Sequence, residues 1–190
     1  VIFQDKRTLF TRAPQQFKIL VPSHTVPSIR INGKNVSVRI SNGIYGDVYF
    51  GAEDGKIGLS DCVFGDVEIM GGDVETHVAG ATVKGNLFLN IDKGNAAAET
   101  TFAKRAEFRI KRGNIGLYNV TCRDCAFDVR KGNITATIAG SEKTFNTTLL
   151  AQEGTVNRKS AKHDGASGSL SACAGKGNIT LDFVEEKEMV

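Results

Sequence analysis

A short turn motif returns along this chain at a nearly constant interval. The motif is a tripeptide of glycine, then aspartate, asparagine or lysine, then an apolar residue. Its copies, spaced mostly 19 or 20 residues apart in two interleaved series, begin at Gly46, Gly65 and Gly85 and at Gly94, Gly113 and Gly132, with others at Gly55, Gly72, Gly177 and, in degenerate form, Gly154. A fixed return of one turn signature is typical of a repeat architecture in which each repeat forms one coil.

The segments between the glycines alternate apolar and polar residues, as half-buried β-strands do. Leu87–Ile91 and Ile134–Ile138 both follow this pattern. Nineteen extended residues at about 3.3 Å each give a perimeter of roughly 60 Å, enough for one coil with two or three corners. Glycine at a corner accepts positive φ, and aspartate or asparagine beside it bonds to nearby backbone.

These features predict an all-β chain folded as a single-stranded β-helix, or solenoid, of about 19–20 residues per coil. The alternative is a β-sandwich, which explains the alternation equally well but not the constant spacing. We expect a single domain, with residues 1–31 as an N-terminal cap or lead-in segment and residues 32–190 as the solenoid. The lead-in holds all three prolines and no glycine. At the other end, we expect Ile179–Val184 to be the last strand.

Composition sets limits on partners and location. The net charge is only +3, which does not demand a nucleic-acid partner, and we expect no specific nucleic acid to bind. We expect no transmembrane segment in this chain, because no stretch stays apolar for the 18 or more residues that a span needs. The chain begins with Val1 rather than Met, and we interpret it as an excised or processed segment that leaves room for a signal peptide or anchor outside it.

Basic residues at the corners are the strongest functional signal. A 19-residue period would stack Lys93, Arg112 and Lys131 at about 4.8 Å per coil. Like charges at that separation repel one another, and an anionic partner would relieve the repulsion. The hypothesis is that an anionic polymer or surface glycan binds here, and the residues assigned to it are Lys93, Arg112, Lys131, Arg109, Lys111 and Arg130. The alternative is a solvated turn face whose charges keep the edge soluble.

The polar corner column, by contrast, favours a structural interpretation. Its later copies are asparagine, as in Asn95, Asn114 and Asn133, whereas a calcium site requires several carboxylates. We therefore expect a ladder of turn hydrogen bonds rather than a metal site.

No catalytic residue, cofactor or metal site is predicted. The pair Cys122 and Cys125 lacks the second pair that a zinc site needs, and we interpret it as an incidental or local disulfide. Three scattered histidines show no metal-ligand spacing, and no nucleophile elbow or phosphate-binding loop is present. The chain is therefore expected not to be an enzyme.

The phased motif resembles adhesin-like domains of the DUF4097 type over about residues 36–183. The closest pieces begin at Gly46, Gly65, Gly113 and Gly175. The resemblance implies a right-handed β-helix in a bacterial cell-envelope or surface-linked protein, with no catalytic residues. We therefore expect a non-enzymatic structural or binding module at the cell surface, or secreted, with a cytoplasmic location as the alternative.

Two other functions stay open. Some β-helices act on polysaccharides through paired carboxylates, and the only close pairs are Asp66 with Glu68 and Asp73 with Glu75. A regulatory envelope-sensing domain would share every feature described above.

Overall fold

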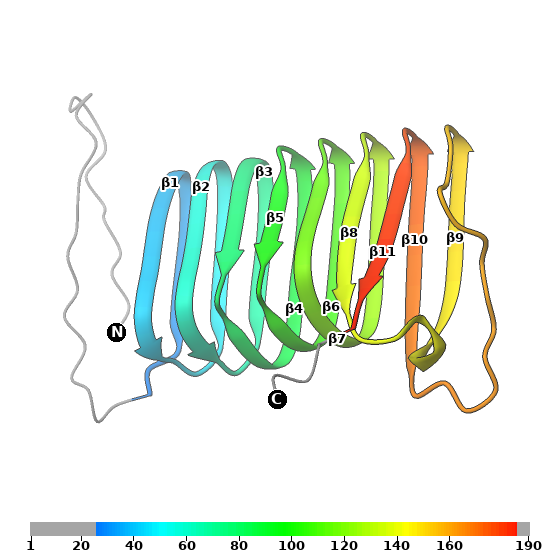
Figure 1. Cartoon of the computed structure of the whole chain (residues 1–190). Helices are drawn as coiled ribbons and strands as arrows, with labels where there is room; N and C mark the ends of the chain where they lie inside the picture. Colours follow the sequence, from blue (N-terminus) through cyan, green and yellow to red (C-terminus); the bar gives the residue numbers. More distant parts are fainter. Residues whose placement is uncertain (1–25, 186–190) are drawn as a thin grey trace, which may run out of the picture.

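The computed structural model describes residues 26–185, which form a nearly all-β structure (Figure 1). One short 3₁₀ helix, η1 (Glu142–Thr144), interrupts the strands. The strands are β1 (Ile29–Ile44), β2 (Val48–Phe64), β3 (Val67–Ala79), β4 (Thr82–Lys93), β5 (Ala96–Glu99), β6 (Phe102–Arg112), β7 (Ile115–Lys131), β8 (Ile134–Ala139), β9 (Phe145–Glu153), β10 (Gly168–Lys176) and β11 (Ile179–Val184).

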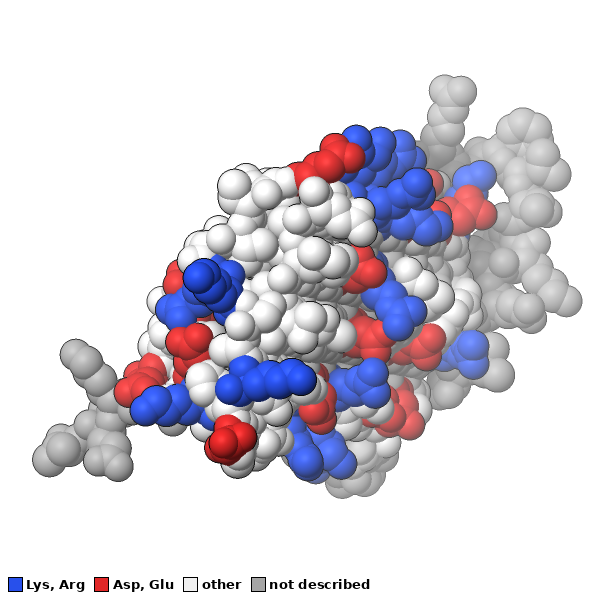
Figure 2. Space-filling view, turned by 90° about the vertical axis from the view of Figure 1, so that its right-hand side faces the viewer, with Lys and Arg blue, Asp and Glu red and all other residues white. Residues whose placement is uncertain are grey.

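Strands of successive coils pair in parallel, so the chain winds as a solenoid. Val48 pairs with Val67, Val67 with Leu87, and Leu87 with Ala106, which are steps of 19, 20 and 19 residues. The steps equal the spacing of the glycine motif. The predicted β-solenoid is confirmed, and the β-sandwich alternative is wrong. Viewed from the β9 end of the axis, charged side chains lie around the outside of the stack (Figure 2).

The corner glycines lie directly over one another along the axis. A Cβ added to Gly113 would come within 1.7 Å of the carbonyl oxygen of Gly94, and one added to Gly132 within 1.7 Å of that of Gly113. Both Gly113 and Gly132 have positive φ, at 142° and 140°. Glycine is required at Gly113 and Gly132 because the backbone of the preceding coil occupies the space that a side chain would take.

One copy of the motif is out of phase with the others. Gly72 does not lie at the corner, because the Cα partner of Gly55 on the next coil is Val74. Asp73, the residue before Val74, pairs in register with Lys93, the residue before the corner glycine Gly94. The tripeptide beginning at Gly72 is therefore part of a strand, and its prediction as a corner is wrong.

A further corner has no fixed sequence motif, because its residue type changes from coil to coil. Its members share a left-handed backbone with φ between 44° and 59°, and they are Asn42, Asp61, Gly80, Thr100 and Asn119. Asparagine, aspartate and glycine tolerate this conformation, whereas Thr100 is strained there.

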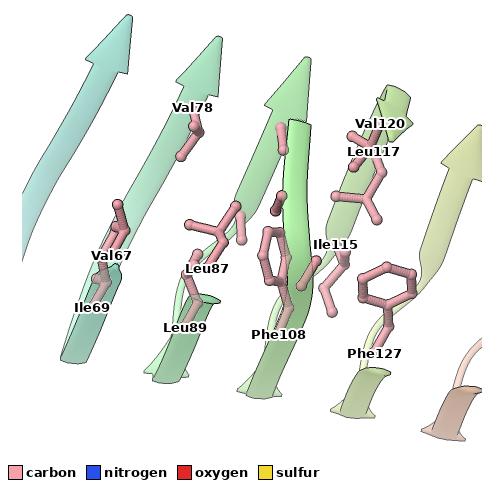
Figure 3. Close-up of a cluster of buried hydrophobic side chains, with 14 of the residues drawn as sticks. Val67, Ile69, Val78, Leu87, Leu89, Phe108, Ile115, Leu117, Val120 and Phe127 are labelled. Carbon is pink, nitrogen blue, oxygen red and sulfur yellow. The ribbon is translucent and has the colours of Figure 1, made fainter. Parts of the chain in front are cut away.

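Columns of apolar side chains fill the interior (Figure 3). Ile69, Leu89, Phe108 and Phe127 succeed one another in register on β3, β4, β6 and β7, and all are buried. The rings of Phe108 and Phe127 pack edge to face with centroids 5.9 Å apart. Each strand buries too little alone, so the stacking of like side chains stabilises the fold.

The last coils are not stacked in chain order. β10 lies between β7 and β9, and β11 pairs with β8, so β9 forms the end of the stack (Figure 1). The corner order is Gly132, Gly177, Gly154, because a Cβ on Gly154 would come within 2.0 Å of the Gly177 carbonyl oxygen. Ile179–Val184 is the last strand of the chain, as predicted, but it pairs with β8, and β9 lies at the end of the stack.

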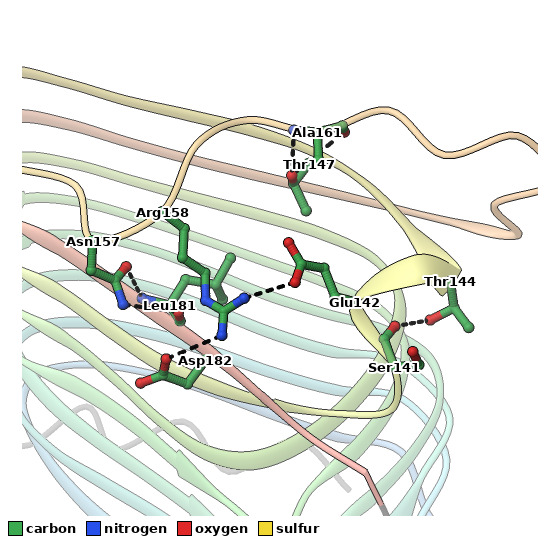
Figure 4. A network of polar contacts seen from close by, with 9 residues as sticks. All are labelled: Ser141, Glu142, Thr144, Thr147, Asn157, Arg158, Ala161, Leu181 and Asp182. Carbon is green, nitrogen blue, oxygen red and sulfur yellow. Dashed lines mark hydrogen bonds and ion pairs between the residues drawn. The ribbon is translucent and has the colours of Figure 1, made fainter.

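The segment between β9 and β10 caps this end of the solenoid (Figure 4). The side-chain amide of Asn157 donates to the Leu181 carbonyl at 3.1 Å and accepts from the Leu181 N–H at 2.9 Å. Arg158 pairs with Glu142 at 2.8 Å and with Asp182 at 3.6 Å. These contacts satisfy backbone groups that an open sheet edge would leave exposed.

The predicted N-terminal segment is only partly visible. Residues 1–25 lie outside the described residues, and with them the greater part of the cap or lead-in. Ile29 to Ile31, the end of that predicted segment, are the first residues of β1 and pair with β2.

Candidate functional site

The four cations that precede one corner form a column, here called the basic ladder: Lys93, Arg112, Lys131 and Lys176. Lys93 pairs in register with Arg112, Arg112 with Lys131, and Lys131 with Lys176. The predicted stacking of Lys93, Arg112 and Lys131 is confirmed. Lys176 joins them although it follows Lys131 by 45 residues, because β10 takes the place next to β7.

Carboxylates neutralise both ends of the basic ladder. Asp73 is the register partner of Lys93 and forms an ion pair with it. Glu153 is the register partner of Lys176 and lies 2.8 Å from its Nζ. The positive charge is therefore concentrated on the two central members, Arg112 and Lys131.

The flanking cations divide into paired and unpaired ones. Lys111 Nζ lies 2.6 Å from Asp92, and Arg109 pairs with Glu107. Arg109 also stands apart from the ladder, on the sheet face in register with Asn90 and Asp128. Asp92 lies one coil before Lys111, 19 residues earlier in the sequence, and Glu107 lies two residues before Arg109 on the same strand.

Within residues 26–185, three of the six predicted cations form no ion pair, and these are Arg112, Arg130 and Lys131. All three are exposed. Arg130 directly precedes Lys131 at the end of β7, and Arg112 is the register partner of Lys131 on β6. We call these three residues the free cluster.

An asparagine ladder fixes the backbone beside the free cluster. The Oδ1 of Asn95 accepts the N–H of Asn114 at 2.9 Å, and the Oδ1 of Asn114 accepts the N–H of Asn133 at 2.9 Å. Asn133 and Asn178 continue the series at 2.8 Å. The predicted ladder of turn bonds is confirmed. Because each amide holds the next coil's N–H, the ladder cations project from a rigid corner.

Beyond the corner, the outer face of the sheet has a position without a side chain, and an exposed aromatic ring lies next to it. On this face Gly116 is the residue after Asn114, because Ile115 points into the core, and Gly116 pairs in register with Ala97 and Thr135. A Cβ added to Gly116 would meet nothing within 4 Å. Tyr118 comes next on this face, with 66% of its surface exposed.

Three of the four carboxylates in the pairs that an enzyme could use, all but Glu68, have hydrogen-bond or ion-pair partners in the described structure. Asp73 is held by Lys93, and Glu75 accepts a hydrogen bond from Asn95 Nδ2 at 3.2 Å. Asp66 Oδ1 accepts the N–H of Asn86 at 2.6 Å. Glu68 lies beside a shallow hollow of about 390 Å³ on the other side of the coil.

The cysteines occupy separate places. Cys122 and Cys125 form a disulfide across a corner, in agreement with the local-disulfide interpretation. Cys62 is buried and Cys173 is half-buried, both as free thiols. Burial, and then the nearby Asp128 carboxylate, raises the pKa of the Cys173 thiol. Among residues 26–185, no group of three or more His, Cys, Asp or Glu side chains could hold a metal ion.

The arrangement of stacked coils agrees with a family model that matches residues 3–187, described as Toastrack DUF4097. The chain belongs to the Toastrack DUF4097 family. No curated protein and no solved structure matches the chain. The Toastrack assignment agrees with the solenoid.

A Toastrack domain of this kind contains little besides strands. In the part of the chain that the structure describes, no helix has the length and apolar character needed to cross a membrane.

Proposed function

We propose that this Toastrack domain is a non-enzymatic binding module of the cell surface or envelope, and that it holds an anionic polymer along its basic ladder. The observation that carries the proposal is the free cluster. Arg112, Arg130 and Lys131 are exposed neighbours without an ion pair in the described structure, whereas the cations around them have carboxylate partners.

Electrostatics supports a polyanion rather than a single small ion. The Cα atoms of Arg112 and Lys131 lie on adjacent strands, about 4.8 Å apart. Cations this close repel each other, and a chain that carries several negative groups relieves the repulsion at more than one point. Because the cluster is exposed, its attraction is screened by salt, and binding should weaken as ionic strength rises.

Rigidity supports binding as well. The asparagine ladder holds the corner at Asn114 and Asn133 through bonds of 2.9 Å, so little backbone freedom is lost when a ligand docks. Of the two carboxylate pairs that a polysaccharide-cleaving enzyme could use, the pair Asp73 and Glu75 is engaged in structural bonds. These contacts favour a binding role.

The disulfide between Cys122 and Cys125 supports a location outside the cytoplasm. Disulfides form and persist mainly in oxidising compartments such as the cell surface. A surface location would also bring the exposed ladder into contact with charged polymers of the envelope.

The proposal is tested by binding of the described domain to polyglutamate, polyphosphate and polygalacturonate at several salt concentrations. We expect affinity to fall as salt rises, and to fall about tenfold or more when the free cluster is removed by R112Q, R130Q and K131Q together. The matched control removes three exposed lysines elsewhere, through K104Q, K143Q and K162Q. Equal losses in the two triple variants, or binding that does not respond to salt, would refute the proposal.

A further inference from the structure

Tyr118 is the most exposed aromatic side chain among residues 26–185, and no structural role explains its exposure. It is 66% exposed, compared with 47% for Phe102. Its strand, β7, also carries Arg130 and Lys131 of the free cluster at its end, and it begins three residues after Arg112. A tyrosine whose ring face and hydroxyl are both exposed to solvent suits a ligand that has an apolar face with polar groups at its edges.

The surface between the free cluster and Tyr118 is open and lined with donors. Along the strand, Asn114 and Tyr118 lie roughly 13 Å apart at about 3.3 Å per residue. Gly116, between them, leaves space beside the ring because a Cβ there would meet nothing within 4 Å. On the next coil, the exposed side chains of Asn133 and Thr135 continue this face with amide and hydroxyl groups.

The carboxylate of Glu99 lies beside Tyr118 and limits which part of a ligand can lie over the Tyr118 ring. Glu99 is the register partner of Tyr118 on the preceding coil and lies 3.4 Å from the Nε2 of His77. Its carboxylate repels negative groups near Tyr118. A ligand must therefore present a neutral face to the ring and its negative groups to Arg112 and Lys131.

We infer that the ligand is an acidic polysaccharide of uronic-acid units, which lies from the free cluster across Gly116 to Tyr118. The inference rests on the proposed function and names its ligand class. Carboxylates would form bidentate hydrogen bonds with the guanidinium groups of Arg112 and Arg130 and an ion pair with the ammonium group of Lys131. The apolar face of a sugar ring would stack on Tyr118, and its hydroxyls would meet Asn133 and Thr135.

The same surface fits a single-stranded nucleic acid less well. Such strands bind through successive bases on several aromatic platforms. Here the register neighbours of Tyr118 and Gly116 on the adjacent coils are Glu99, Ala97 and Thr135, none of which is aromatic.

The test compares Y118A, Y118F and the unaltered domain for binding to a galacturonate oligosaccharide, to polyphosphate and to a single-stranded DNA oligonucleotide. We expect Y118A to lose about fivefold to tenfold in affinity for galacturonate and to bind polyphosphate unchanged. Y118F should keep galacturonate affinity, because it keeps the ring. F102A is the matched control, and it should bind as the unaltered domain does.

The outcomes separate the inference from the function on which it rests. If Y118A binds galacturonate as the unaltered domain does, while R112Q with K131Q still weakens every polyanion, the sugar inference fails and the polyanion site stands. If DNA binds more tightly than galacturonate and loses affinity in Y118A, the ligand class is wrong. If none of the three probes binds, both the inference and the proposed function fail.

Discussion

The side-chain oxygen of Asn114 accepts a hydrogen bond from the backbone N–H of Asn133, one coil further along the axis, at 2.9 Å. The Nδ2 of Asn114 also donates to Asn95 Oδ1 at 3.0 Å. One side chain thus ties three successive coils together at the corner that carries the basic ladder. The proposed binding surface and the stability of the domain therefore share the same corner.

Removing this side chain should destabilise the domain moderately. N114A loses the bond to the Asn133 N–H and the bond to Asn95, and we expect the free energy of unfolding to fall by about 1–2 kcal/mol. Chemical denaturation measures it. The control is N90A, because Asn90 forms no side-chain hydrogen bond in the described structure. A loss in N114A no larger than in N90A would contradict a stabilising ladder.

The corner glycine and a face glycine on the same strand should respond very differently to alanine. In G113A the new Cβ would meet the Gly94 carbonyl oxygen at 1.7 Å, and φ is 142°, so we expect a loss of about 3 kcal/mol or more. G116A should change stability little, because nothing lies within 4 Å of the added Cβ. Thermal denaturation of both variants decides the matter, and similar melting temperatures would show that the coils do not stack at Gly113.

Residue spacing predicted the solenoid because a coil of fixed length returns the same turn chemistry to the same corner. It succeeded where the corner needs glycine, as at Gly94 and Gly113. It failed where several residue types fit one conformation, as at Thr100 and Asn119, whose left-handed backbone has no single sequence signature. A period alone also cannot separate a corner glycine from a strand glycine such as Gly72.

The order in which the last strands stack could not be predicted from the residues within those strands. Nothing in the residues of the segments that become β9 and β10 indicates which of the two lies next to β7. Placement is decided by contacts between distant residues, such as Leu170 with Cys125 and Asn157 with Leu181. The one-coil spacing that stacks Arg112 with Lys131 also places Asp73, 20 residues before Lys93, beside that lysine, although the prediction took account of the cations alone.

The cap at the β9 end should control local opening of β11. Replacement of Asn157 by alanine removes both side-chain bonds to Leu181, at 3.1 and 2.9 Å. We expect the Leu181 amide to exchange hydrogen at least several times faster in N157A, with little change at Ile69 in the core. Hydrogen exchange followed by mass spectrometry measures it. Unchanged exchange at Leu181 would show that Asn157 does not protect this edge.

The thiol of Cys173 should react slowly with alkylating reagents at mildly alkaline pH. Burial and the Asp128 carboxylate raise its pKa, so less reactive thiolate is present at a given pH than for an ordinary cysteine. D128N removes one of the two causes, lowers the pKa and should speed alkylation about twofold or more. Mass spectrometry after timed iodoacetamide treatment follows the reaction. A slower or unchanged rate in D128N would contradict this assignment.

The most direct test of the account is a map of backbone amide shifts while a galacturonate oligosaccharide is titrated into the isotopically labelled domain. Binding at the free cluster predicts that the largest changes fall at Arg112, Asn114, Lys131 and Asn133, and that they diminish as salt is added. Changes centred instead on Arg105 and Arg123, or no changes at saturating oligosaccharide, would contradict it.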